Sequence, residues 1–71
     1  MGAGDELIGK VGRLTGAIEP RGMGEVHLPV RGGTESFYCY AGDPAEAIPA
    51  GTRVLVIEHE GSRTVTVSRY P

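Results

Sequence analysis

The chain has 71 residues, of which 39% are hydrophobic and 23% are charged, and its formal net charge is −2. This length holds one domain, the composition is that of a globular protein, and the slightly acidic balance disfavours nucleic-acid-binding proteins, which gather basic residues on one face. A single cysteine, Cys39, excludes an internal disulfide and a cysteine-rich metal site.

Twelve glycines and five prolines separate short runs of β-branched and aromatic residues. This pattern is typical of all-β barrels and sandwiches, in which tight turns connect short strands. Residues 1–6 are predicted to be a flexible lead-in, and residues 7–71 are predicted to form the folded domain.

The first strand is expected over residues 10–18, where every second residue shares one face: Gly12, Leu14, Gly16 and Ile18. Two glycines on that face indicate strong coiling or close approach of neighbouring backbone, as small barrels require. A turn is predicted at residues 19–22, in which Pro20 fixes φ at the first central position and Gly22 tolerates a positive φ.

The second strand is predicted over residues 24–30, with four inward residues: Gly24, Val26, Leu28 and Val30. The period of two predicts one buried face and one face in contact with water. Pro29 has no amide hydrogen, so we expect it at a sheet edge or a bulge. Residues 31–34 supply the next turn.

The third strand is predicted over residues 36–41, with Phe37, Cys39 and Ala41 facing inward. Cys39 is then a small buried hydrophobic residue rather than a reactive thiol. The same alternation directs Tyr38 and Tyr40 outward.

A one-turn helix is predicted at residues 43–46, because Asp43 is a good cap, Pro44 suits the first helical position and Glu46 completes a capping box. The fourth strand is expected over residues 53–60. Its four consecutive apolar residues indicate burial on both faces, beneath the short helix. This longest apolar run is far below the ~20 residues of a membrane-spanning helix.

A hairpin turn at residues 60–62 leads into the fifth strand, in which Val65 and Val67 alternate with polar residues. Three strands, a short helical turn and two further strands predict an all-β fold, a five-stranded OB-type Greek-key barrel.

Catalytic chemistry requires converging groups with tuned pKa values, and the sequence offers none. His27 and His59 lie on different predicted strands, without a second metal ligand at a useful spacing. We therefore expect no enzyme, no metal and no cofactor. A hydrolase with Cys39 as nucleophile is a distant alternative, because a histidine could approach it only in space.

The alternative binding class is a module for single-stranded nucleic acid, because barrels of this type stack bases on exposed aromatic residues. Tyr38 and Tyr40 would form the stacking surface, with Arg31 nearby, although the seven basic residues are spread evenly along the chain. Cross-strand packing on a half-buried sheet face explains the two tyrosines as well as a contact surface does, and nucleic acid is the less favoured ligand for such a surface.

Five blocks, in this order and spacing, resemble the C-terminal soluble domain of NfeD-like membrane proteins: residues 7–12, 20–26, 48–56, 60–61 and 65–67. The resemblance runs from about Leu7 to Tyr70. The stretch 22–26 followed by Gly32 and Gly33 looks like the flotillin-associated, YuaF-like branch. The aromatic crowding at residues 37–40 departs from the family pattern.

The resemblance implies an OB-fold domain on the cytoplasmic face of the membrane, attached to transmembrane helices that are absent from this chain. It implies a flotillin- or stomatin-type (SPFH) scaffold protein as partner, with a role in membrane microdomains or in regulation of membrane protease activity. The family pattern offers no catalytic residues to carry over.

We therefore expect a non-catalytic protein-interaction domain that binds such a scaffold protein or a second copy of itself. The outward side chains expected to contact the partner are Tyr38, Tyr40, Arg31 and His27.

Overall fold

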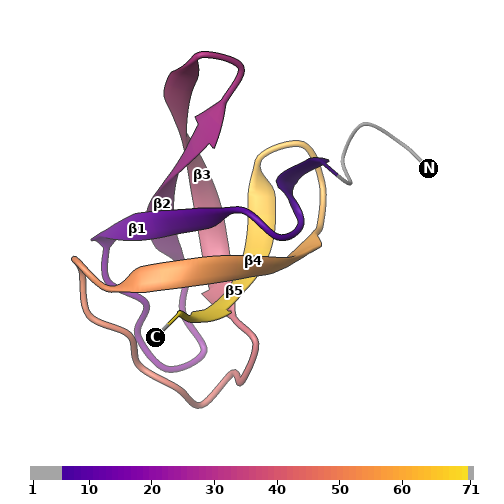
Figure 1. The fold of residues 1–71 in the computed structure, drawn as a ribbon. Helices are drawn as coiled ribbons and strands as arrows, with labels where there is room; N and C mark the ends of the chain where they lie inside the picture. Colours follow the sequence, from indigo (N-terminus) through magenta and orange to yellow (C-terminus); the bar gives the residue numbers. More distant parts are fainter. Residues whose placement is uncertain (1–5, 71) are drawn as a thin grey trace.

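The computed structural model describes residues 6–70, and within them five strands close into a barrel (Figure 1). The strands are β1 (Val11–Gly16), β2 (Gly24–Val30), β3 (Gly33–Ala41), β4 (Arg53–His59) and β5 (Thr64–Arg69). The predicted lead-in lies outside the described residues except for Glu6. The all-β, five-stranded barrel predicted from the sequence is confirmed.

The order of strands around the barrel is β1-β2-β3-β5-β4, and β4 pairs with β1 to complete the circle. Four of these pairings are antiparallel. The fifth is parallel and joins β3 to β5, from Tyr38 opposite Thr64 to Ala41 opposite Val67. In the described part of the chain, no helix has the length and apolar character to cross a membrane.

Alternate residues of the strands point inward and form one continuous core, which contains no buried polar or charged side chain among residues 6–70. The predicted alternation of β2 is confirmed, as is the inward direction of Phe37, Cys39 and Ala41. Besides Ile18, which follows β1, the core takes two further residues from outside the strands. Leu7 precedes β1, and Ile48 lies in the connection between β3 and β4.

The first strand is shorter than predicted, because its register with β2 becomes irregular between Leu14 and Gly16. Ile18 nevertheless faces inward, where it forms an isolated bridge with Ile48. The expected close approach of backbone is confirmed at Gly12. A Cβ atom there would collide with the carbonyl oxygen of His27 and lie 2.6 Å from Leu28 Cδ2.

The turn after Ile18 has its positive φ at Arg21 (61°), and the prediction that Gly22 supplies it is wrong. Gly22 donates its N–H to the carbonyl of Glu19 at 2.8 Å, which makes Gly22 the fourth residue of the turn. In a type II turn the third residue takes the positive φ, and here that residue is Arg21.

The hairpin between β2 and β3 turns through only Arg31 and Gly32, which both have positive φ. Such two-residue turns match the twist of the flanking strands, so pairing resumes at once and β3 begins at Gly33 rather than at the predicted residue 36. The pairing of β1 with β2 reaches only His27. Pro29 therefore lies beyond it, on a projecting section of β2, which confirms the edge position (Figure 1).

The predicted helix at residues 43–46 is absent, which corrects the sequence expectation. The chain makes a single turn at Asp43, whose carbonyl oxygen accepts a hydrogen bond from the N–H of Glu46 at 2.9 Å. The Asp43 side chain also accepts a hydrogen bond, from the N–H of Ala45 to its Oδ1 at 3.0 Å. The chain then extends at once, because Ile48 must pair with Ile18. The Glu46 carboxylate binds Arg69 instead of completing a capping box.

Because no helix covers β4, its predicted burial on both faces is also wrong. Val54 and Val56 are buried, Leu55 is half-buried and Ile57 is exposed. The strand ends at His59, one residue earlier than expected. The hairpin into β5 and the inward direction of Val65 and Val67 are confirmed.

Candidate interaction site

Three of the four predicted contact residues share the outer face of β2 and β3. Tyr38 and Tyr40 alternate with inward residues of β3 and are 53% and 44% exposed. In the register of the two strands, Glu25 stands opposite Tyr38 and His27 opposite Ser36. His27 is therefore a neighbour of Tyr38 on this face.

Arg31 is not part of this group. It lies in the hairpin turn, four residues beyond His27, and a strand rises about 3.3 Å per residue, which separates it from the tyrosines by well over 10 Å. The predicted set of four residues is thus divided by the structure.

An exposed methionine that the sequence analysis did not single out extends the tyrosine surface. Met23 directly precedes Gly24, which pairs with Cys39, the residue between the two tyrosines. Met23, Tyr38 and Tyr40 are all exposed. We refer to these three residues, the two tyrosines and the adjoining methionine, as the aromatic row.

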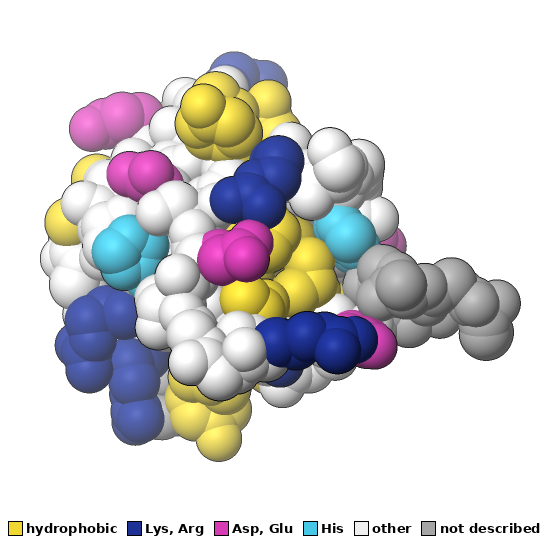
Figure 2. Space-filling model, turned by 90° about the horizontal axis from the view of Figure 1, so that it is seen from above, with side chains coloured by type: hydrophobic (Ala, Val, Ile, Leu, Met, Phe, Trp, Pro, Cys, Tyr) yellow, Lys and Arg dark blue, Asp and Glu magenta, His cyan; other side chains and the backbone are white. Residues whose placement is uncertain are grey.

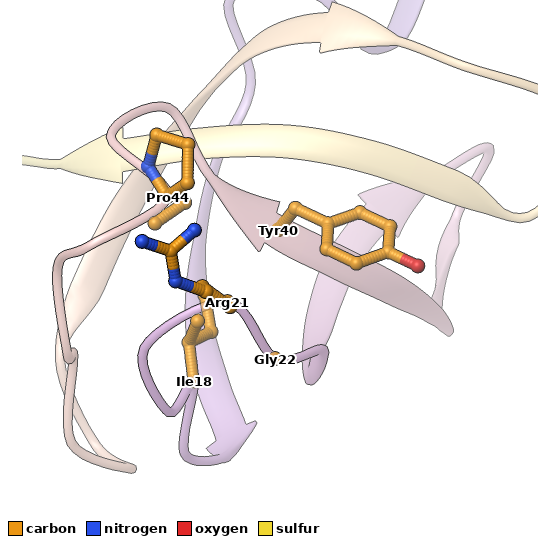
Figure 3. Close-up of a pocket in the computed structure, with 6 residues that line it drawn as sticks. Ile18, Arg21, Gly22, Tyr40 and Pro44 are labelled. Atoms are coloured by element: carbon orange, nitrogen blue, oxygen red, sulfur yellow. The ribbon is translucent and has the colours of Figure 1, made fainter.

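A pocket of about 380 Å³ adjoins the aromatic row at Tyr40. It is lined by Ile18, Arg21, Gly22, Tyr40, Ala41 and Pro44. Figure 3 shows the Arg21 guanidinium beside the ring of Pro44, with the Tyr40 ring extending from β3 and its hydroxyl directed away from Arg21.

The pocket exists because two loops that are distant in the sequence meet. The N–H of Arg21 donates to the carbonyl of Pro44 at 2.6 Å, and Ile18 and Ile48 exchange two backbone hydrogen bonds of 2.9 Å. These bonds attach the β1–β2 connection to the β3–β4 connection. No local pattern in the sequence signals such a meeting, so the pocket could not be predicted.

Cys39 lies directly beneath the aromatic row, on the inner face of β3, and is fully buried. Burial, as the main cause, raises the pKa of its thiol to about 11. The thiol is therefore neutral at physiological pH, which agrees with the predicted role of a small core residue. Within residues 6–70 no cluster of three or more histidine, cysteine, aspartate or glutamate side chains could hold a metal ion.

Several arginines are engaged within the domain. Arg63 pairs with Glu35 at 2.9 Å, and Arg69 pairs with Glu46 at 2.8 Å. Arg13 donates to the carbonyl of Gly51, and Arg53 lies over the ring of Tyr70. On the face seen in Figure 2, basic and acidic side chains both lie around a hydrophobic patch.

Comparison with known proteins gives a consistent picture. Residues 11–68 match the family model of the NfeD C-terminal domain. The solved soluble domain of the NfeD protein YuaF from Bacillus subtilis is 32% identical, with a TM-score of 0.79 over 93% of this chain and 76% of that chain. No curated protein matches the chain.

Two further solved structures share the fold. The C-terminal domain of stomatin operon partner protein 1510-C from Pyrococcus horikoshii is 27% identical, with a TM-score of 0.67 over 94% of this chain and 92% of that chain. The soluble domain of a Corynebacterium glutamicum membrane protein implicated in regulation of membrane protease activity is 20% identical, with a TM-score of 0.81 over 97% of this chain and its whole length. At 20% identity, the likeness to the Corynebacterium glutamicum domain concerns the fold alone.

Proposed function

The chain belongs to the NfeD C-terminal domain family, as its sequence resemblance indicated, and on this premise we propose that it is the non-catalytic interaction domain of a membrane-anchored protein. Its partner in this proposal is a flotillin- or stomatin-type (SPFH) scaffold protein on the cytoplasmic face of the membrane. The contact would serve membrane microdomain organisation or the regulation of a membrane protease. One structural neighbour is a stomatin operon partner protein, which supports this class of partner.

We also propose that the barrel is of the OB type. Its strand order, closed by a parallel pairing of β3 with β5, agrees with the Greek-key topology of that architecture. Such barrels use exposed strand faces and loops to bind their ligands, which directs attention to the outer face of β2 and β3.

The observation that carries the proposal is the aromatic row. The core is complete on the inner side of β3, through Phe37, Cys39 and Ala41, so the tyrosines of the outer side are not needed to fill it. Tyrosine and methionine are enriched in the buried centres of protein interfaces. Thr64 and Thr66 of β5 stand opposite the two tyrosines but leave about half of each side chain in water.

The absence of catalysis remains a prediction, and two observations support it. The one cysteine is buried with a neutral thiol. The described residues contain no acidic, histidine or cysteine cluster suited to a metal ion.

The proposal is tested by titrating the 15N-labelled domain with a stomatin- or flotillin-type protein from the same organism. We expect localised amide shifts at residues 23–25 and 38–40. The double variant Tyr38→Ser with Tyr40→Ser should weaken binding about tenfold or more, as expected for a pair of central aromatic contacts. Unchanged thermal midpoints would show that the variant is folded.

Tyr70→Ser is the matched control, because Tyr70 is 42% exposed but lies after β5, where Arg53 of β4 lies over its ring. It should leave the affinity within about twofold, as peripheral contacts do. Equal losses in both variants, or no shifts at millimolar scaffold protein, would refute an interaction through the aromatic row.

Single-stranded nucleic acid is the alternative ligand, and the exposed tyrosines favour it. The engaged arginines and the net charge of −2 weigh against it. A short oligonucleotide added to the same sample should give no shifts at physiological salt. Shifts that disappear steeply as salt rises would replace the adaptor proposal with this one.

A further inference from the structure

We propose that the pocket beside Tyr40 receives an acidic segment of the partner polypeptide, with an apolar side chain inside the pocket and an adjacent carboxylate paired with Arg21. This inference rests on the proposed function and names the chemistry that the partner must present. The pocket falls within the roughly 300–1,000 Å³ typical of ligand sites.

Arg21 is the charged residue of the pocket and the reason to expect an anion. Within residues 6–70 its guanidinium has no acidic partner and no hydrogen bond, whereas Arg63 and Arg69 both have carboxylate partners. In the facing turn, the Asp43 carboxylate accepts a hydrogen bond from the N–H of Ala45 and the Glu46 carboxylate pairs with Arg69. The Arg21 charge is therefore available to a carboxylate brought by another molecule.

The backbone holds Arg21 in a conformation that favours glycine. Its φ of 61° lies in the left-handed region, where the Cβ atom of any residue other than glycine is crowded by the backbone. The bond of its N–H to Pro44 and the bond of Gly22 to Glu19 maintain this geometry. Strained residues of this kind are concentrated at binding sites, where a particular side chain is needed at a particular place.

The other walls of the pocket are apolar. Ile18 and Ala41 are core residues that the pocket reaches from outside, and Pro44 and the Tyr40 ring stand at its sides. An inorganic anion would use Arg21 alone, and a purely apolar ligand would leave the guanidinium unpaired. A peptide with neighbouring apolar and acidic side chains uses both features, and it extends naturally onto the aromatic row through Tyr40.

The test uses two capped tripeptides as probes, acetyl-Leu-Asp-Leu-amide and the neutral acetyl-Leu-Asn-Leu-amide, titrated into the 15N-labelled domain. We expect the acidic probe to shift the amides of Ile18, Arg21, Gly22, Tyr40 and Ala41. Its affinity should exceed that of the neutral probe about three- to fivefold, the value of one partly exposed ion pair.

Arg21→Gly supplies the decisive variant, because glycine accepts the positive φ without strain. Its thermal midpoint should equal or exceed that of the wild type, while the preference for the acidic probe disappears. Arg21→Lys should retain part of the preference. Loss of the preference together with a lower midpoint in both variants would instead assign Arg21 a structural role.

Three outcomes would overturn the pocket inference. One is equal affinity of the domain for both probes. Another is the absence of amide shifts with the acidic probe at about 10 mM, a concentration far above the dissociation constants of specific peptide binding. The third is a response confined to phosphatidylglycerol vesicles, which would assign the pocket to a lipid surface.

If the scaffold protein binds Arg21→Gly and the wild type equally, the pocket inference fails while the proposed function stands. If the scaffold protein binds neither, the proposed function fails as well.

Discussion

Cys39 shows how the barrel interior controls the chemistry of a single residue. Loss of solvent is the largest cause that raises the pKa of its thiol, and the charge of Glu25 raises it further. A backbone hydrogen bond from Gly24 acts in the opposite direction without reversing the result. The side chain therefore contributes to stability as an uncharged apolar group.

A pH dependence of stability follows from this shift. The pKa in the folded state, about 11, lies above the ordinary value of 9.0. The contribution of Cys39 to the free energy of unfolding is therefore complete below pH 9.0. It declines as the pH rises toward 11, because the thiol loses its proton at a lower pH in the unfolded chain than in the folded domain. Urea midpoints measured across this range should fall more for the wild type than for Cys39→Ala. Parallel curves, or rapid native-state reaction with a thiol reagent, would contradict the burial of the thiol.

Gly24 provides a second test at the scale of one residue. A Cβ atom there would lie 2.6 Å from Ile18 Cγ1 and 2.7 Å from the carbonyl oxygen of Gly16. Gly24→Ala should therefore lower the free energy of unfolding by about 1–3 kcal/mol, the usual cost of overpacking. Gly33→Ala is the matched control, because a Cβ atom there would meet nothing closer than 3.8 Å. Equal denaturation midpoints for the two variants would refute the close approach.

Among the elements, the connection between β3 and β4 matters most for the candidate site. It contains one turn and one bridge residue, Ile48, which is fully buried and exchanges backbone hydrogen bonds with Ile18. This bridge brings Pro44 to Arg21. An irregular segment thus holds the pocket together through a core residue rather than through a helix.

The contribution of that bridge residue can be measured by truncation. Ile48→Ala should cost about 2–5 kcal/mol of unfolding free energy, as for other fully buried isoleucines. Ile57→Ala removes the same atoms from a side chain that is 39% exposed, and should cost less than about 1 kcal/mol. Chemical denaturation of both variants gives the comparison. A similar loss at the two positions would show that Ile48 does not anchor the connection.

The difference between local and distant signals explains which elements could be predicted. The alternation in residues 24–30 and the inward valines of β5 are local patterns, and both were predicted correctly. The capping signature at Asp43 is also local, but pairing of Ile48 with Ile18 prevents a helix from continuing there. Burial of β4 on both faces was inferred from that helix and was wrong for the same reason.

At the scale of the whole molecule, the fold class and the family could be predicted, whereas the geometry of the site could be predicted only in part. Alternation along β3 sufficed to direct Tyr38 and Tyr40 outward. The pocket depends on contact between Arg21 and Pro44, which are neighbours only in the folded barrel. Arg31 was grouped with the tyrosines because their distance along the hairpin was not visible from the sequence.

The position of β5 in the barrel has a consequence during translation. β5 is the last strand to be synthesised, and it lies between β3 and β4, pairing with both. Until residues 64–69 have left the ribosome, β3 and β4 each present an unpaired edge, and such edges favour association with other chains. The nascent domain therefore depends on the release of its final strand, and any delay between the emergence of β4 and that of residues 64–69 would prolong the interval in which aggregation competes with folding.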